Sequence, residues 1–181
     1  MNLSRLGKVW MFLMGIALVG LGACSTVTQP LDALTQAEPD GTRQRAMRRL
    51  HLASAYFEQG QNEVAQQEVR AALQIDADYA EAYSLLGLIH QRAQAPTLAQ
   101  QSFEKAIQLG TQSPVHGAEL AAIQHNYGWF LCEQNLFSDA HAQFNLALAQ
   151  PGYRQVDKTK KAIDFCNVRD KANMNVRKSN N

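Results

Sequence analysis

Three stretches of the chain repeat the same spaced set of large and small apolar residues. In each stretch a large residue stands beside a small one, and two further small residues and one larger residue follow at fixed intervals. The three sets are Leu52, Ala53, Ala65, Val69 and Ala72, then Leu86, Gly87, Ala99, Phe103 and Ala106, then Tyr127, Gly128, Ala140, Phe144 and Ala147. The spacing predicts two helices per unit. The small residues allow these two helices to approach each other closely.

The first step between units is 34 residues and the second is 41, measured from Ala65 to Ala99 and from Ala99 to Ala140. A 34-residue period with Ala-x3-Phe resembles the tetratricopeptide repeat. The resemblance implies an all-α, right-handed superhelix of helix-turn-helix pairs. Residues 44–153 are expected to hold three repeats, at about 46–79, 80–113 and 121–154. About three repeats are needed to bury a continuous core, and proteins of this architecture hold other proteins.

The longer second step contains seven extra residues after Leu109. Ser113 and Pro114 together are typical of a helix start. Seven residues make nearly two helical turns. If the first helix of the third unit begins at Pro114, its faces therefore stay in register when it reaches Gly128. The alternative is a loose seven-residue loop.

The first 23 residues have the layout of a signal peptide. Arg5 and Lys8 precede an apolar run over residues 9–20, which is too short to span a bilayer comfortably. The run ends in Leu21-Gly22-Ala23-Cys24, which resembles a bacterial lipoprotein cleavage box. This resemblance implies that Cys24 is the first mature residue and carries the lipid that anchors the protein. An ordinary secretory signal is the alternative.

Residues 24–43 follow as a polar tether. Cys24 is followed by Ser25 and not by the aspartate that resembles an inner-membrane retention signal, which favours the outer membrane. The protein is therefore expected to be lipid-anchored there and to face the periplasm.

The whole chain has 17 basic and 16 acidic side chains, but residues 154–181 hold eight basic and three acidic ones. We expect residues 155–181 to be a basic, solvated tail or a partial capping helix. Such a tail could touch an acidic partner, lipid or nucleic acid, and export removes nucleic acid as a partner. Cys132 and Cys166 stand one period apart, on adjacent and equivalent helices, where we expect free, half-buried thiols.

No pattern of catalytic or cofactor-binding residues is present. The five histidines do not have metal-ligand spacing, and neither a zinc box, a glycine-rich phosphate loop nor a serine elbow occurs. The sequence therefore predicts a protein that is not an enzyme and has no metal, cofactor or small-molecule substrate.

In each unit, the residues of the first helix that do not take part in packing should line the concave groove of the superhelix. The candidates for the partner-binding groove are Met47, Leu50, Phe57, Leu88, Arg92 and Trp129. Leu50 and Phe57 are expected to point away from the packing face that contains Leu52 and Ala53. An open apolar stripe usually marks an interaction site, although a tether segment near Leu31–Leu34 could cover it instead.

The run from His125 to Cys132, together with the lipoprotein box and the tether, resembles the type IV pilus biogenesis/stability lipoproteins, the pilotin family called PilF or PilW. The resemblance covers residues 24 to about 153. It implies an outer-membrane lipoprotein that binds secretin subunits and promotes their outer-membrane localisation and multimerisation, with Leu50 and Phe57 as secretin contacts.

The C-terminal part departs from that family, whose members continue with further helix pairs. Ala162 and Phe165 fall one period after Gly128 and Leu131, so a fourth first helix could begin there. Lys161, however, takes the place of a large apolar residue.

The alternative function is a general periplasmic scaffold for peptidoglycan or envelope-assembly proteins.

Overall fold

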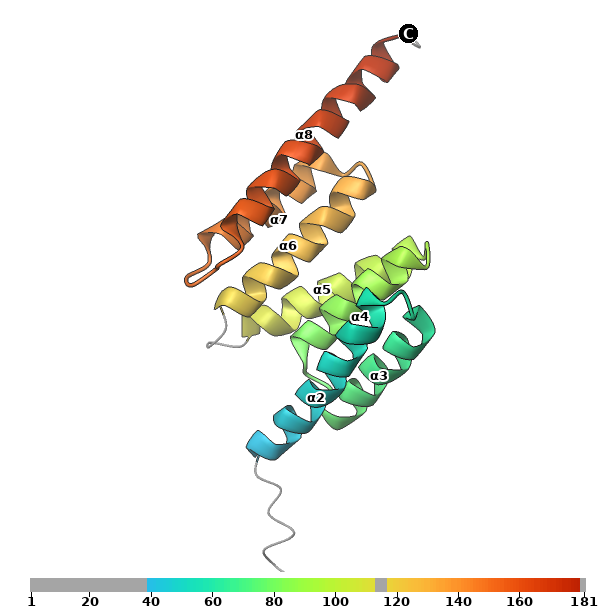
Figure 1. Cartoon of the computed structure of the whole chain (residues 1–181). Coiled ribbons are helices and arrows are strands. Elements are labelled where there is room, and N and C mark those ends of the chain that lie inside the picture. The colour runs from blue at the N-terminus through green and yellow to red at the C-terminus, as the bar shows by residue number, and fades with distance from the viewer. Residues whose placement is uncertain (1–38, 113–116, 180–181) are drawn as a thin grey trace, which may run out of the picture. The chain divides into compact units, whose positions relative to one another are not determined.

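The computed structural model describes residues 39–112 and 117–179, and these form seven helices and no strand (Figure 1). The helices are α2 (Pro39–Glu58), α3 (Asn62–Ile75), α4 (Ala80–Arg92), α5 (Pro96–Gln112), α6 (Gly117–Glu133), α7 (Phe137–Ala149) and α8 (Val156–Ser179). None of these described helices is both long and apolar enough to cross a membrane. The signal sequence, Cys24, most of the tether and the Ser113–Pro114 helix start lie outside the described residues.

The helices form three hairpins, α2–α3, α4–α5 and α6–α7, followed by α8. The first helices make one continuous layer, because α4 contacts both α2 and α6, and α6 contacts α8. The second helices α3, α5 and α7 each touch first helices, and no pair of them is in contact in the described part of the chain. This arrangement confirms the all-α tetratricopeptide superhelix, with the first helices on its inner face.

Each hairpin is held by a close approach between a small residue on the first helix and a larger one on the second. A Cβ atom added to Gly87 would lie 2.8 Å from the ring of Phe103, and one added to Gly128 would lie 2.8 Å from the ring of Phe144. In the first hairpin the equivalent residues are Ala53 and Val69, both fully buried. Where the second helix carries valine, the first helix therefore has room for the methyl group of alanine. Where the second helix carries phenylalanine, the first helix requires glycine.

In each of the three hairpins the first helix is followed by one residue in the left-handed conformation. These residues are Gly60 (φ 78°), Gln94 (φ 55°) and Asn135 (φ 61°). The next N–H in each hairpin donates to a carbonyl five residues back, at 2.9 Å in all three cases. This is the Schellman arrangement, for which glycine and asparagine are the usual residues and Gln94 is an exception.

The seven extra residues lengthen two helices rather than one. α5 and α6 have 17 residues each, whereas α3 has 14 and α4 has 13. The described part of α6 begins at Gly117, and the expected start at Pro114 lies outside the described residues.

Leu52 departs from its expected place in the packing face, since 40% of it is exposed. Its equivalent in the third unit, Tyr127, stacks on Phe103 of the preceding α5, with ring centroids 5.6 Å apart. Among the described residues no helix precedes α2, so Leu52 has no such neighbour.

Of the two expectations for residues 155–181, the partial capping helix agrees with the structure and the solvated tail does not, because residues 156–179 form the single helix α8. Thr159, Ala162 and Cys166 are buried on one side of α8, and the helix packs on α6 and α7. The other side remains exposed, including Val168 and Val176.

The expectation of free thiols is also wrong, since Cys132 and Cys166 form a buried disulfide that joins α6 to α8. Their Cα atoms are 5.8 Å apart. Cα atoms lie about 2.3 Å from a helix axis, so those on facing sides come several ångströms closer than the axes do. The separation therefore falls within the range that a disulfide bridges.

We expect Gly128→Ala to lower the free energy of unfolding by about 1–2 kcal/mol, because the new methyl group overlaps the buried Phe144 ring. Gly41→Ala is the matched control. Gly41 lies in α2 with nothing within 4 Å of the added Cβ, so this change should stabilise the helix slightly. Equal effects of the two changes in chemical denaturation would show that the close approach does not matter.

Loss of the disulfide should release α8 from α6. The Cys132→Ala/Cys166→Ala variant is expected to lose about 2–4 kcal/mol of stability, because the bond closes a 34-residue separation in the unfolded chain. Reduced wild type should melt like this variant, and oxidised wild type clearly higher. An unchanged melting temperature after verified reduction would contradict this role.

Candidate protein-binding groove

The inner layer of first helices forms a groove made of two adjoining hollows. The central hollow lies among α2, α4 and α6, and the second lies among α4, α6 and α8. Leu50, Ser54, Glu81, Ser84, Leu85, Leu88, Ala122, Ile123 and Asn126 line the central hollow. Leu88, His125, Asn126, Trp129, Lys158, Lys161, Ala162 and Phe165 line the second, which we call the α8 pocket. Leu88 and Asn126 border both hollows, so the groove is continuous.

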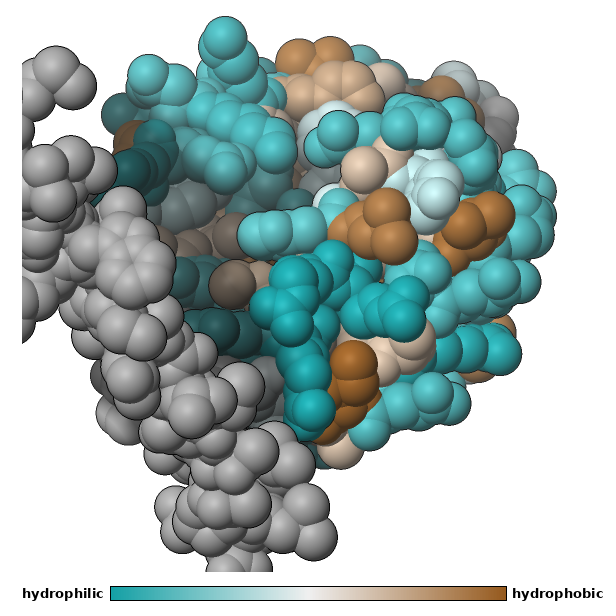
Figure 2. All heavy atoms as spheres, turned by 60° about the horizontal axis from the view of Figure 1, so that its bottom comes forward, coloured by the Kyte–Doolittle hydropathy of each residue, from teal (hydrophilic) through white to brown (hydrophobic). Residues whose placement is uncertain are grey.

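On the face shown in Figure 2, the described surface is mainly hydrophilic, with separate hydrophobic patches. Met47 is 38% exposed and lines a further hollow with Tyr79 and Ile123, at the N-terminal ends of the first helices. Met47 is therefore accessible but, contrary to expectation, does not line either part of the groove.

Leu50 lines the central hollow but is only 7% exposed. It belongs to the first core cluster with Ala82 and Leu85 of α4. The expectation that packing does not need Leu50 is therefore wrong, because α4 packs against the side of α2 that bears it. A polar residue at this position would disturb the fold as well as any contact with a partner.

Phe57 and Arg92 form a pair instead of presenting separate contacts. The guanidinium carbon of Arg92 lies 3.6 Å from the centroid of the Phe57 ring. Arg92 Nη1 also donates to the main-chain carbonyl of Phe57 at 2.6 Å and to Asn62 Oδ1 at 3.3 Å. Neither residue lines either hollow of the groove, contrary to expectation. The half-buried ring is covered by a cation from the next unit, so the pair is a cation–π contact between hairpins.

Leu88 and Trp129 both line the α8 pocket, and a third apolar residue, Phe165, lines it with them. Trp129 stacks on Phe165 of α8, with ring centroids 5.1 Å apart and planes 25° apart. Sequence reasoning did not place Phe165, Lys158 or Lys161 in the groove. The available signal was that Ala162 repeats the small position of Gly128, which places a further first helix beside α6.

A buried hydrogen-bonded chain supports the wall of the α8 pocket. His125 Nδ1 lies 2.8 Å from Thr159 Oγ1, which in turn lies 2.6 Å from the Tyr153 hydroxyl. Burial, with a smaller contribution from the positive charge of Lys158, lowers the pKa of His125 to about 4. The imidazole is therefore neutral at neutral pH, and α6 and α8 are joined here without a buried charge.

The side chains around the groove are mainly uncharged at neutral pH. Tyr79 and Tyr127 lie outside both hollows; burial is the main cause that raises the pKa of each to about 12, so both phenols remain neutral. Among the described residues, no group of three His, Cys, Asp or Glu side chains is placed to hold a metal ion. The groove presents apolar side chains edged by amide, hydroxyl and charged groups, which suits a polypeptide.

Comparison with known proteins agrees with this fold. Residues 53–94 match the TPR repeat family and residues 80–109 match the tetratricopeptide repeat family. A Haemophilus influenzae protein of uncharacterised function is 33% identical over 122 residues, which cover 67% of this chain and 64% of that protein. The type IV pilus assembly protein PilF of Pseudomonas aeruginosa is 29% identical over 123 residues, covering 68% of this chain and 45% of PilF.

Two solved structures agree with the sequence comparison. The structure of Pseudomonas aeruginosa PilF has a TM-score of 0.62 and 25% identity, covering 73% of this chain and 55% of PilF. The structure of PilW, a type IV pilus biogenesis factor, has a TM-score of 0.60 and 28% identity, covering 68% of this chain and 53% of PilW. This chain thus spans roughly half to two thirds of the relatives it resembles.

Acid should weaken the protein through His125. Its pKa is about 4 when folded and 6.5 in an unfolded chain, so the unfolded state binds the proton more readily between these values. The stabilising effect of neutral His125 is fully present above pH 6.5 and is lost as the pH falls toward 4, at most about 3 kcal/mol. His125→Gln should flatten the dependence of the unfolding free energy on pH over this interval. Parallel curves for variant and wild type would contradict the assignment.

Proposed function

We propose that this tetratricopeptide-repeat protein is a lipid-anchored factor of type IV pilus biogenesis. In this proposal it resides at the outer membrane, faces the periplasm, and holds a segment of a secretin subunit in its groove. Holding that segment promotes the outer-membrane localisation and multimerisation of the secretin. The protein acts by binding and not by catalysis.

The observation that carries the proposal is the structure of the run from His125 to Cys132, on which the pilotin resemblance rests. In α6 its residues alternate between packing and presentation. Gly128 admits the Phe144 ring, Cys132 is bonded to α8, and Trp129 lies in the groove. The run thus contains residues that hold the helices together and a residue that a partner can contact. The similarity in sequence and structure to PilF and PilW supports the same cellular process.

The disulfide supports the proposed compartment. Disulfides persist mainly in oxidising environments such as the bacterial periplasm, and the Cys132–Cys166 bond lies in the packed interior. This agrees with export by the signal sequence and anchoring through Cys24. An acylated Cys24 would hold the body near the membrane, within the reach of the tether.

A general periplasmic scaffold is the alternative, because tetratricopeptide repeats serve many assemblies. The two functions differ in what fails when the protein is absent. Deletion should abolish secretin multimers and twitching only if the protein serves the secretin.

Complementation of a deletion strain tests the proposal with three variants. Cys24→Ser should fold but leave the membrane fraction, and Trp129→Ser should keep the membrane location but lower secretin multimers. Leu146→Ser is the matched control, because Leu146 is an exposed apolar residue on α7, away from the groove. Each variant is assayed for heat-resistant secretin multimers, twitching, membrane fractionation and thermal melting.

Wild-type multimers in the deletion strain would exclude the secretin role. A Cys24→Ser protein that stays with the outer membrane in high salt would exclude lipid anchoring. A normally folded Trp129→Ser protein that restores full multimers would place the secretin contact outside this part of the groove.

A further inference from the structure

The α8 pocket has a composition that the rest of the groove lacks. Its apolar floor is formed by Leu88, Trp129 and Ala162, and Phe165 stands at its edge with 45% of its surface exposed. The hollow is bounded by Leu88 of α4, by the two aromatic rings and by the small side chain of Ala162. An exposed aromatic beside an open apolar floor is a suitable seat for an apolar side chain of a partner.

The edge of the pocket is basic. Lys158 and Lys161 both line it and are both exposed. The ion pairs between described residues are Arg43–Asp76 and Arg49–Glu68, which join α2 to the end of α3 and to α3 itself, and neither includes Lys158 or Lys161. Neither lysine is therefore neutralised by a salt bridge within the described part of the protein.

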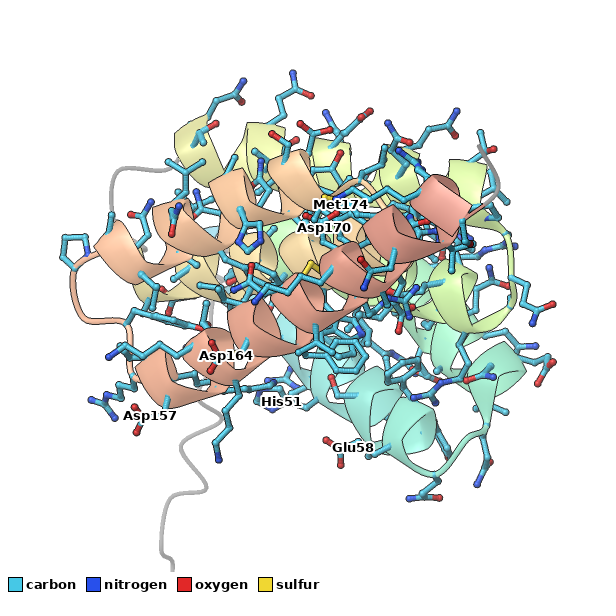
Figure 3. The ribbon with its side chains drawn as sticks, turned by 90° about the horizontal axis from the view of Figure 1, so that it is seen from above. His51, Glu58, Asp157, Asp164, Asp170 and Met174 are labelled. Atoms are coloured by element: carbon cyan, nitrogen blue, oxygen red, sulfur yellow. A yellow bond between two sulfur atoms is a disulfide. The ribbon has the colours of Figure 1, made fainter. Side chains whose placement is uncertain are left out.

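The other titratable groups do not cancel this charge inside the pocket. His125 is neutral at neutral pH, as shown above, and the pocket lining contains no carboxylate. α8 does carry Asp157 and Asp164, which Figure 3 shows along the N-terminal half of that helix, but neither lines the pocket. The neighbouring central hollow contains Glu81 instead. The charge along the groove thus changes from acidic at α4 to basic at α8.

We propose that the α8 pocket binds an acidic, apolar segment of a protein partner, with an apolar side chain against Trp129 and Phe165 and carboxylates beside Lys158 and Lys161. The inference rests on the proposed function, since it names the kind of segment that the secretin subunit would supply. Charge complementarity selects the partner, and the aromatic pair supplies the apolar contact.

The change of charge along the groove also sets a direction. The acidic end of the segment lies at α8, and its neutral or basic end lies near Glu81. A segment bound in the opposite direction would place carboxylates against Glu81 and lose the attraction of the lysines.

The experiment uses the full chain, purified in detergent with its disulfide intact, and two ligands. The first is the purified periplasmic region of the secretin. The second is a short fluorescent peptide of glycine and serine with Leu-Phe at its centre and an acidic residue on each side, compared with the same peptide carrying lysines instead. Binding is measured by anisotropy at low and high salt.

Lys158→Glu/Lys161→Glu should weaken binding of the acidic peptide and of the secretin region at least about tenfold, because attraction becomes repulsion. High salt should reduce the difference. Lys160→Glu/Lys171→Glu is the matched control, since these exposed lysines are on the same helix outside the pocket. It should bind like wild type. Phe165→Ser should weaken both ligands without lowering the melting temperature much, because Phe165 is exposed.

The outcomes separate the two proposals. Secretin binding that is indifferent to the Lys158/Lys161 reversal overturns the pocket assignment and leaves the proposed function standing. Binding of the acidic peptide with the expected dependence, but no binding of secretin, supports the pocket and overturns the secretin role. No binding of either ligand overturns both.

Equal effects of the two double reversals would reduce the inference to a general effect of net charge and overturn it. Anionic phospholipid vesicles are included as a competitor. If they bind through Lys158 and Lys161 while the acidic peptide does not, the pocket is a lipid headgroup site and the proposal is wrong.

Discussion

The close approach of two helices at one small residue is the constraint on which the rest of the structure depends. In each hairpin, a residue without a bulky side chain lets the second helix place Val69, Phe103 or Phe144 directly against the first helix. This contact fixes which side of the first helix faces its hairpin partner. The remaining sides then face either the next hairpin or the groove. A protein interior is packed densely enough that one added methyl group at Gly128 would have to displace the Phe144 ring or the helix.

Successive hairpins are joined by contacts of different chemical kinds. The first and second are linked by Leu50 in the core and by the Arg92–Phe57 pair. The second and third are linked by stacking of Tyr127 on Phe103 and by the hydrogen bond from Asn126 to Ser84. α8 is held by a disulfide and by the His125–Thr159–Tyr153 chain. Only the last of these junctions depends on both pH and redox conditions.

The repeat could be predicted from sequence because packing within a hairpin depends on local spacing. Two of the three Schellman turns follow equally from local signals, at Gly60 and Asn135, whereas the residue type of Gln94 does not indicate the third. Leu50 and Leu52 could not be placed in the same way. Their exposure depends on which neighbouring hairpin covers them, and the spacing within one unit does not contain that information. The Cys132–Cys166 pairing could not be derived from the spacing either, because the distance between two helix axes does not give the shorter distance between Cα atoms on their facing sides.

The groove shows the same division between local and non-local information. Trp129 and Leu88 were found because each occupies an inward position of its own helix. Phe165 and the two lysines were missed because Lys161 breaks the apolar pattern, which made α8 look like a poor repeat. In the structure, α8 departs from the packing pattern of the other first helices at Lys161. A position that packing would have filled with a large apolar residue holds an exposed cation instead, beside an aromatic ring that the core does not cover. The departure from the repeat at Lys161 therefore gives the α8 pocket a basic edge beside an exposed aromatic ring, which the rest of the groove does not have.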